Sequence, residues 1–136
     1  MKYRVLHEFH DGLFDGIRLE SDKTATLFLR SGVKRSYTMI LKGVEALVLN
    51  DLRPGNIILD LTVRNSREAT LEDVLSLYQT DRNSEHAAKL LDNLREKHLY
   101  ILELNPSYGA EGLFLFESFD IIEISQLSGL PVVQRQ

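Results

Sequence analysis

The strongest constraint on the fold of this chain is the alternation of apolar and polar residues in its first third. Apolar side chains occupy every second position over residues 17–20, 25–30 and 37–41. Because the side chains of a strand alternate between the two faces of a sheet, each stretch has one apolar face. Turn-forming residues separate the stretches, at Ser21-Asp22-Lys23 and at Ser31-Gly32. The pattern predicts an antiparallel meander of three strands with one buried face.

Two further strands are predicted on either side of a well-defined turn. Gly43 ends the alternation, and residues 44–52 and 56–63 are both apolar and rich in β-branched side chains. Arg53-Pro54-Gly55-Asn56 suits a type II turn, in which proline sets φ at the second position and glycine supplies a positive φ at the third. We therefore expect a β-hairpin. The apolar residues of 44–52 also fit a helical spacing, which leaves a helix there as the alternative.

The periodicity then changes to that of helices. Apolar side chains recur at three- and four-residue spacing over residues 70–79 and again over 84–98. This spacing is typical of amphipathic helices that pack one face against a core. Thr70 and Asp73 have the spacing of a capping box, with aspartate in place of the preferred glutamate. We predict two α-helices, at about 70–79 and 84–98.

Strand patterns return in the last third of the chain, over residues 99–104 and 112–124. In the second stretch both faces are apolar, because Phe114 and Phe116 point one way while Leu113 and Leu115 point the other. A strand of this kind is covered on both faces. We expect the helices to cover one face, and a second sheet layer or a partner subunit to cover the other.

Together these patterns predict an α+β fold in a single domain that spans residues 1–136. We expect a mainly antiparallel sheet of about six to eight strands, with the two helices inserted before the last two strands. A chain of 136 residues is long enough to bury a core without disulfides. The tail, residues 125–136, is expected to be irregular.

The composition excludes several classes of function. The chain has no cysteine, which excludes disulfides, thiolate catalysis and cysteine-ligated metals. No apolar run approaches the ~20 residues of a membrane helix, and the first residues lack the apolar stretch of a signal peptide. The sequence also lacks the phosphate-binding glycine motifs and the nucleophile-elbow motif. We predict a cytoplasmic protein with no cofactor, no metal and no membrane association.

The net charge of −4 is unevenly distributed along the chain. Residues 1–67 carry 11 basic and 8 acidic side chains, whereas residues 68–136 carry 5 and 12. Since no basic stripe is present, the sequence does not favour binding to nucleic acid. The acidic second half would favour a basic protein partner. The alternative is that these carboxylates only keep a small domain soluble.

A polar segment near the start, His7–Gly12, holds two of the four histidines. The helical zinc motif needs its histidines four positions apart, whereas His7 and His10 are three apart and would point to opposite faces of a strand. His10 with Asp11 could still supply two metal ligands or an oriented base. The alternatives are a recognition surface, or a structural turn in which Asp11 caps the turn and His10 bonds the backbone.

A second polar segment, Asn105–Glu111, begins with a sequence that suits a type I turn around Pro106. Ser107, Tyr108 and Glu111 would then offer a hydroxyl, a phenol and a carboxylate on one loop. Loops held by a rigid sheet often bind ligands, and tyrosine is a frequent interface anchor. The alternative is that Tyr108 folds back over the sheet edge and covers the core.

Three short segments carry a resemblance to a known group of proteins. They are Phe9-His10-Asp11-Gly12-Leu13, then Gly55-Asn56-Ile57-Ile58 with Asp60, then Pro106-Ser107-Tyr108-Gly109-Ala110. In this order they resemble small uncharacterised bacterial domains, some of which are immunity proteins of polymorphic toxin loci. The resemblance spans most of the chain and includes no catalytic motif. It implies a stoichiometric protein-binding role, for which the acidic second half would suit a basic toxin.

The leading hypothesis is a non-catalytic binding protein that recognises another protein by surface complementarity. Its candidate binding residues are His10, Asp11, Ser107, Tyr108, Glu111, Glu117, Asp120 and Glu123. One alternative is an enzyme or small-ligand binder with a pocket around His10, Asp11 and Tyr108. Another is a structural homodimer formed through a strand at Phe114–Ile124.

Overall fold

The structure is a computed structural model that describes residues 3–124. This part of the chain contains β1 (Tyr3–Val5), η1 (His7–Phe9), β2 (Leu13–Leu19), β3 (Ala25–Arg30), β4 (Ser36–Lys42), β5 (Ala46–Asn50), β6 (Asn56–Asn65), η2 (Ser66–Glu68), α1 (Leu71–Tyr78), α2 (Glu85–Glu96), β7 (Tyr100–Tyr108), β8 (Glu111–Phe116) and β9 (Ser118–Glu123). The pairings between these strands are antiparallel. The predicted α+β class with a mainly antiparallel sheet is therefore confirmed, while the predicted irregular tail lies outside the described residues.

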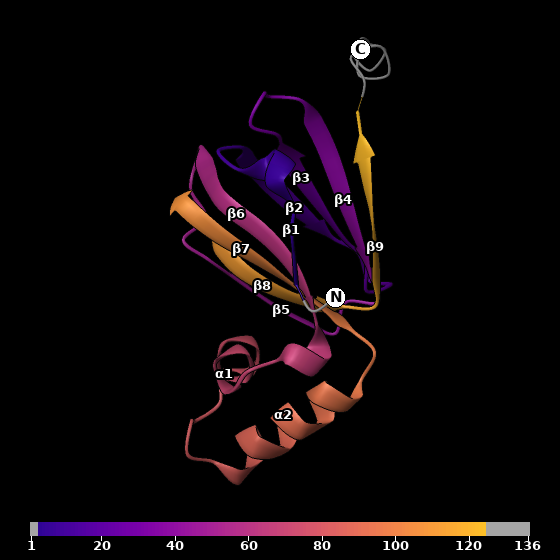
Figure 1. The fold of residues 1–136 in the computed structure, drawn as a ribbon, viewed down its shortest axis with the longest axis vertical. Helices are drawn as coiled ribbons and strands as arrows, with labels where there is room; N and C mark the ends of the chain where they lie inside the picture. The colour runs from indigo at the N-terminus through magenta and orange to yellow at the C-terminus, as the bar shows by residue number, and fades with distance from the viewer. Residues whose placement is uncertain (1–2, 125–136) are drawn as a thin grey trace.

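The strands form one sheet that turns over on itself into two layers (Figure 1). One layer contains β5, β8, β7 and β6, with β1 beside β6, and the other contains β2, β3, β4 and β9. The layers are joined where Leu13 and Phe14 of β2 pair with Ile57 and Asn56 of β6. The layers come together at the lower end of Figure 1 and separate toward the upper end. The three-strand meander predicted from the alternation is present as β2, β3 and β4.

The main core lies between the two layers. The alternating apolar residues of β3 and β4 pack against inward residues of β6, β7 and β8, with these side chains buried: Leu27, Leu29, Met39, Leu41, Ile58, Leu61, Leu102, Leu104 and Phe114. Phe9 of η1 is completely buried in the same core. Burying a large apolar side chain contributes roughly 1.5–3 kcal/mol, so this core holds the two layers together.

A second apolar cluster lies between the helices and the outer face of the first layer. Side chains on one face of α1 and α2 pack against Ile101 of β7 and Leu115 of β8. The capping box predicted at the start of α1 is present, because Asp73 N donates to Thr70 Oγ1 and Thr70 N donates to the Asp73 carboxylate. Both helices lie within the predicted ranges. Neither of them, over the described residues, is long and apolar enough to cross a membrane.

The predicted hairpin across the Pro54-Gly55 turn is wrong. The turn itself is present, with a φ of 76° at Gly55. However, the strands on either side of it do not pair with each other, because β5 pairs with β8 while β6 lies between β7 and β2. Turn chemistry is local, whereas the choice of partner strand is made by the packing of the whole sheet.

The prediction of one strand over 112–124 is also wrong. β8 ends at Phe116 and β9 begins at Ser118, so Glu117 alone links two strands that lie in different layers. Within residues 3–124, three strands rather than two follow the helices, and the total of nine exceeds the predicted six to eight. The strand named in the homodimer alternative, Phe114–Ile124, is thus two strands, of which only β9 lies at an edge of the sheet, and self-association stays a prediction.

The second polar segment is a strand end rather than a turn. β7 extends to Tyr108, and Pro106 lies opposite Ile58 where the register of β6 and β7 is irregular. Proline is tolerated at such irregularities because it leaves no ladder donor unpaired there. The chain instead turns at Gly109, which has a φ of 86°.

Buried Asn56 joins three segments that lie far apart in the sequence. Its Oδ1 accepts hydrogen bonds from the backbone N–H of Arg53 at 2.8 Å and of Ala110 at 2.9 Å. Its Nδ2 donates to the carbonyl oxygens of Arg53 at 2.6 Å and of Phe14 at 3.2 Å. Both donors and both lone pairs of the side-chain amide are thus used. Asn56 therefore ties β2, the turn before β6 and the turn after β7 together.

We expect Asn56→Ala to destabilise the fold by about 2–4 kcal/mol, because it leaves several buried backbone groups without partners. The measurement is the free energy of unfolding from urea denaturation followed by circular dichroism. Asn83→Ala, at an exposed turn position, is the matched control and should cost less than about 0.5 kcal/mol. Equal losses in the two variants would contradict this role of Asn56.

Candidate functional site

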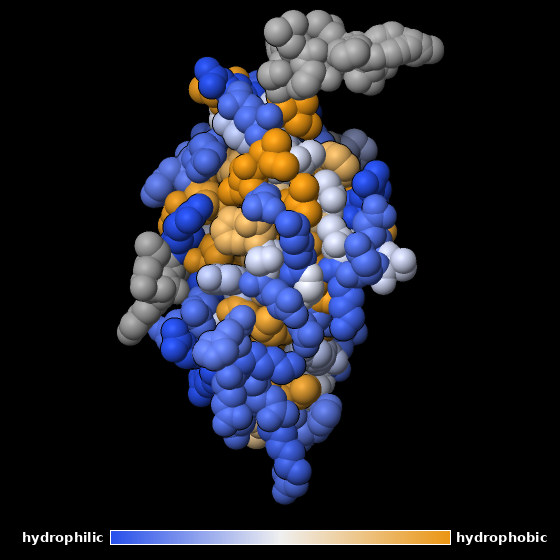
Figure 2. All heavy atoms as spheres, turned by 90° about the vertical axis from the view of Figure 1, so that its right-hand side faces the viewer, coloured by the Kyte–Doolittle hydropathy of each residue, from blue (hydrophilic) through white to orange (hydrophobic). Residues whose placement is uncertain are grey.

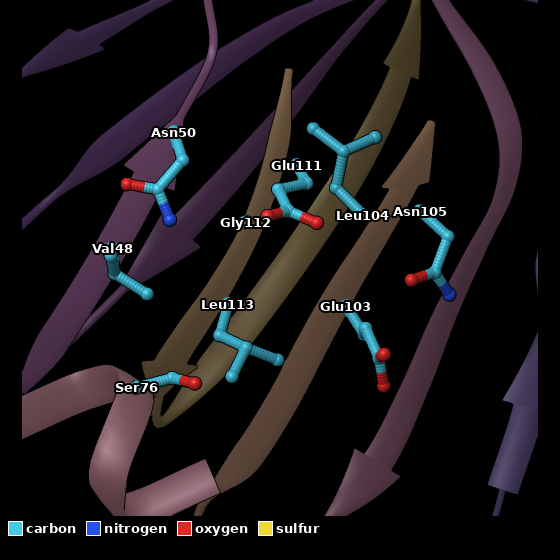
Figure 3. Close-up of a pocket in the computed structure, with 9 residues that line it drawn as sticks. All are labelled: Val48, Asn50, Ser76, Glu103, Leu104, Asn105, Glu111, Gly112 and Leu113. Carbon is cyan, nitrogen blue, oxygen red and sulfur yellow. The ribbon is translucent and has the colours of Figure 1, made fainter. Parts of the chain in front are cut away.

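A polar groove of about 160 Å³ lies on the outer face of the first layer, beside α1 (Figure 3). Its polar lining consists of Asn50 on β5, Ser76 on α1, Glu103 and Asn105 on β7, and Glu111 on β8. Val48 and Leu113 add apolar side chains to the walls, and Leu104 and Gly112 line the groove with backbone, since the Leu104 side chain is buried in the core between the layers. The groove thus combines an apolar surface with several hydrogen-bonding groups at short range.

The strand register explains why these side chains meet. Asn50 lies opposite Glu111 across β5 and β8, while Leu113 lies opposite both Val48 and Glu103. Paired residues of neighbouring strands point to the same face, so the polar groups gather on the outer face. Figure 3 shows the carboxylates of Glu103 and Glu111 projecting from adjacent strands, with Asn50 on one side and Asn105 on the other.

An ion-pair network forms the border between the groove and α1. Arg64 of β6 makes two 2.7 Å hydrogen bonds to the carboxylate of Asp73 on α1, and a 3.3 Å contact to Glu103 Oε1. Arg64 and Asp73 are nearly buried, with side-chain exposures of 12% and 8%. Burial alone would raise the pKa of Asp73, but the hydrogen bonds from Arg64 and Thr70 outweigh burial and lower that pKa below 3.8.

The groove carries an excess of negative charge and of hydrogen-bond acceptors. Arg64 is matched by Asp73, so it compensates Glu103 only through the longer contact. Glu111 is exposed and makes no side-chain hydrogen bond or ion pair among the described residues. Asn105 uses its Nδ2 to donate to Asp60 at 2.8 Å, which leaves its carbonyl oxygen as an acceptor. Such a site favours a cationic ligand group.

The first predicted segment lies elsewhere. His10 Nδ1 donates to the carbonyl oxygen of Leu59 at 2.6 Å, so the expected bond to the backbone is present. Asp11 has a φ of 61°, and its carboxylate lies 3.6 Å from His10 Nε2. A second pocket, which contains His10, is lined also by His7, Glu8, Ser31, Gly32, Val33, Arg35 and Tyr37. Neither Asp11 nor Tyr108 lines that pocket, so the structure does not assemble the three-residue pocket of the enzyme hypothesis there.

The two predicted polar segments flank the same short stretch of β6. Asp11 N donates to the carbonyl oxygen of Ile58 at 2.9 Å, and Tyr108 lies opposite Ile57 on the other side of β6. Tyr108 is half exposed, so it does not act as a buried lid on the core. Ser107 is also exposed. Neither residue lines the groove, whereas Glu111 of the same segment does.

The three acidic residues predicted at the end of the chain do not form an uncompensated patch. Asp120 pairs with Lys42 at 3.0 Å, and Glu123 pairs with Arg35 at 3.7 Å. The first pair joins β9 to β4, and the second joins β9 to Arg35, the residue before β4. Glu117 lies in the link between the layers, next to Gly43. The acidic groove is therefore separate from these residues.

Sequence reasoning missed four of the groove residues: Asn50, Ser76, Glu103 and Asn105. One signal was available, because Glu103 interrupts the apolar sequence Ile101-Leu102-Glu103-Leu104. A charge inside an otherwise apolar strand marks a side chain that faces a polar site or a buried partner. The sequence around Ser76 contains no comparable signal, because Ser76 lines the groove only through the packing of α1 against the sheet.

The described residues contain no group of three or more histidine or acidic side chains placed to hold a metal ion. Comparisons with protein-family models, with curated proteins and with solved structures found no match to this chain.

We expect Asp73→Asn to cost about 3 kcal/mol at pH 7, because it leaves the nearly buried Arg64 with only its 3.3 Å contact to Glu103. Since the folded-state pKa of Asp73 is lowered, the stabilisation is present above the ordinary carboxyl pKa and is lost as pH falls through the folded-state value. Urea denaturation from pH 7 to pH 2.5 should show the difference from wild type shrinking below about pH 4.

Glu72→Gln, on the same helix but exposed, is the control and should change stability by less than about 0.5 kcal/mol at any pH. A difference between Asp73→Asn and wild type that stays constant down to the lowest pH would contradict the assignment.

Proposed function

We propose that this protein is a non-catalytic binding protein that holds a basic side chain of a partner protein in the groove between β5, β8, β7 and α1. The observation that carries the proposal is the pair of carboxylates, Glu103 and Glu111, in one groove with three neutral hydrogen-bonding side chains. These groups are suited to binding a cation rather than to activating a nucleophile.

The chemistry of the groove fits the two parts of a lysine or arginine side chain. Val48 and Leu113 offer apolar surface for the methylene stem, and the carboxylates offer acceptors for the charged head group. An arginine guanidinium has five donors in a planar fork and suits several separate acceptors better than an ammonium does. We therefore expect arginine to bind more tightly than lysine.

The resemblance to immunity proteins remains a prediction that is compatible with this function. An immunity-type protein acts by stoichiometric binding, and an acidic groove would suit a basic partner surface. Electrostatic complementarity of this kind would speed association and make it sensitive to salt. A cytoplasmic location is likewise proposed rather than shown.

The test uses a labelled peptide, acetyl-Gly-Arg-Gly-Arg-Gly-amide, and fluorescence anisotropy. We expect saturable binding that weakens with salt, while the same peptide with glutamine in place of arginine does not bind. Glu111→Gln should weaken binding by up to about fivefold, since a partly exposed ion pair contributes roughly 0.2–1 kcal/mol. The side chain of Glu111 makes no hydrogen bond or ion pair among the described residues, so Glu111→Gln should leave the fold intact.

Glu85→Gln removes the same charge from an exposed position at the start of α2, away from the groove. This control should bind the arginine peptide as wild type does. If Glu85→Gln and Glu111→Gln weaken binding equally, the peptide senses only the net charge and the groove is not the site. Equal binding of the glutamine peptide would also contradict the proposal.

A further inference from the structure

The last described strand, β9, is an edge of the sheet. Among the described residues β9 pairs only with β4, and it stands at one end of the strand order. Its sequence, Ser118-Phe119-Asp120-Ile121-Ile122-Glu123, contains no proline, and no register shift interrupts its pairing with β4. Proline and bulges are two devices by which natural edge strands avoid pairing with other chains.

The hydrogen bonds of β9 show which of its backbone groups face away from β4. Ile124 N donates to the carbonyl oxygen of Ser36 at 2.8 Å. Because donors alternate along an antiparallel strand, the N–H groups of Ile122 and Asp120 also face β4. The N–H and C=O groups of Phe119, Ile121 and Glu123 consequently face the open edge. This edge is a template for one more antiparallel strand.

We propose that the occupant of this edge is β9 of a second copy of this chain, paired antiparallel about a two-fold axis at Ile121. In this register Ile121 lies opposite itself, and Phe119 of each copy lies opposite Glu123 of the other. All three are residues whose backbone groups face the open edge, so the new ladder uses the free donors and acceptors. The contact is self-complementary, as a two-fold interface requires.

Charge complementarity selects this register. The guanidinium of Arg4 lies over the ring of Phe119, with Cζ 5.9 Å from the ring centroid. Residues directly opposite in a ladder have Cβ atoms roughly 5 Å apart, so Glu123 of one copy comes within reach of Arg4 of the other. The two-fold axis makes this ion pair twice. Moving the axis to residue 120 would place Asp120 opposite Asp120 and repel, whereas moving it to residue 122 would place Glu123 opposite Ile121 and lose the ion pair with Arg4.

The outer face of β9 adds apolar area next to the axis. Ile122 and Ile124 are 48% and 38% exposed, and Phe28 lies two strands away in the same row of the sheet as Ile122. Figure 2 looks at the side of the molecule where β4 and β9 lie and shows apolar side chains gathered in its upper half, among hydrophilic ones. Pairing of β9 strands continues this face across two copies.

The proposed interface is independent of the acidic groove. The groove lies on β5, β8, β7 and α1 in the first layer, while β9 belongs to the second. Loss of peptide binding in groove variants therefore says nothing about self-association, and the reverse also holds. A dimer formed in this way would carry two grooves.

Sedimentation equilibrium of the intact chain tests the proposal. We expect a concentration-dependent rise from 15.6 kDa to twice that mass. Glu123→Arg should weaken the dimer at least tenfold, because it places like charges opposite each other. Combining Glu123→Arg with Arg4→Glu should restore most of the lost affinity. A monomer at all concentrations, or a dimer that Glu123→Arg does not weaken, would overturn the proposal.

A cysteine test fixes the register, because the chain has no cysteine of its own. Ile121→Cys should form a disulfide-linked dimer on oxidation, since opposite residues with Cα atoms roughly 5.5 Å apart suit a disulfide. Ser118→Cys, on the same strand but opposite Ile124 in this register, should stay monomeric on a non-reducing gel. Circular dichroism of both reduced variants checks that they fold. Equal cross-linking of the two variants would overturn the register.

Discussion

The ion pair between Arg64 and Asp73 is the interaction on which the groove depends. It connects β6 to the first turn of α1 through two short hydrogen bonds, and both side chains are nearly buried. Removing two charges from water is costly, so the pair fixes the position of α1 on the sheet more than it stabilises the fold. Because Asp73 is also the residue that closes the capping box with Thr70, the same carboxylate both starts α1 and attaches it to the sheet.

The ion pair between Arg64 and Asp73 also affects Glu103, the other carboxylate that Arg64 contacts. Arg64 gives its two best hydrogen bonds to Asp73, so Glu103 receives only a 3.3 Å contact and keeps acceptor capacity toward the groove. Glu111 on the next strand is close enough to line the same groove, with α1 contributing Ser76 as a wall. The ion pair between Arg64 and Asp73 therefore determines the position of α1, and with it the shape of the groove and its excess of negative charge.

Two short links between the layers determine where the surfaces lie. Glu117 joins β8 to β9, and residues 43–45 join β4 to β5 beside it. Two hydrogen bonds hold these links together: Glu117 N donates to the Lys42 carbonyl at 2.9 Å, and Glu45 N donates to the Leu115 carbonyl at 2.8 Å. Gly43 has a φ of 66°, and a Cβ there would meet the Glu117 side chain at 2.5 Å. These links send β8 and β9 to different layers, which separates the acidic groove from the β9 edge.

The sequence was sufficient to predict features that depend on near neighbours. The alternation over residues 17–41, the two amphipathic helices and the capping box at Thr70 are all local patterns, and all are present. Pairing was predicted wrongly where it is set by distant parts of the chain. No turn residue marks Glu117 as a strand boundary, and the proline in Asn105–Tyr108 suggests a turn, although the irregular register with β6 accommodates it as strand.

The candidate site was predictable only in part for the same reason. Glu111 was a candidate from its place in a polar segment, and Glu103 could have been found as the one charge among apolar neighbours. That these two carboxylates share a groove follows from the β7–β8 register, in which Glu103 lies opposite Leu113 and Leu104 opposite Gly112. The number of acidic residues in the second half of the chain did not indicate a binding surface, since Asp120 is paired with Lys42 of β4 and Glu123 with Arg35 just before β4.

Amide chemical shifts test most directly whether the groove between β5, β8, β7 and α1 binds a guanidinium group. The measurement is a titration of ¹⁵N-labelled protein with N-acetyl-arginine amide, with N-acetyl-glutamine amide as the reference ligand. We expect the largest arginine-specific shifts at residues 48–50, 103–105 and 111–113, and little change at residues 118–124. Shifts that are largest outside the groove, or that are equal for the two ligands, would contradict binding of a guanidinium group in the groove.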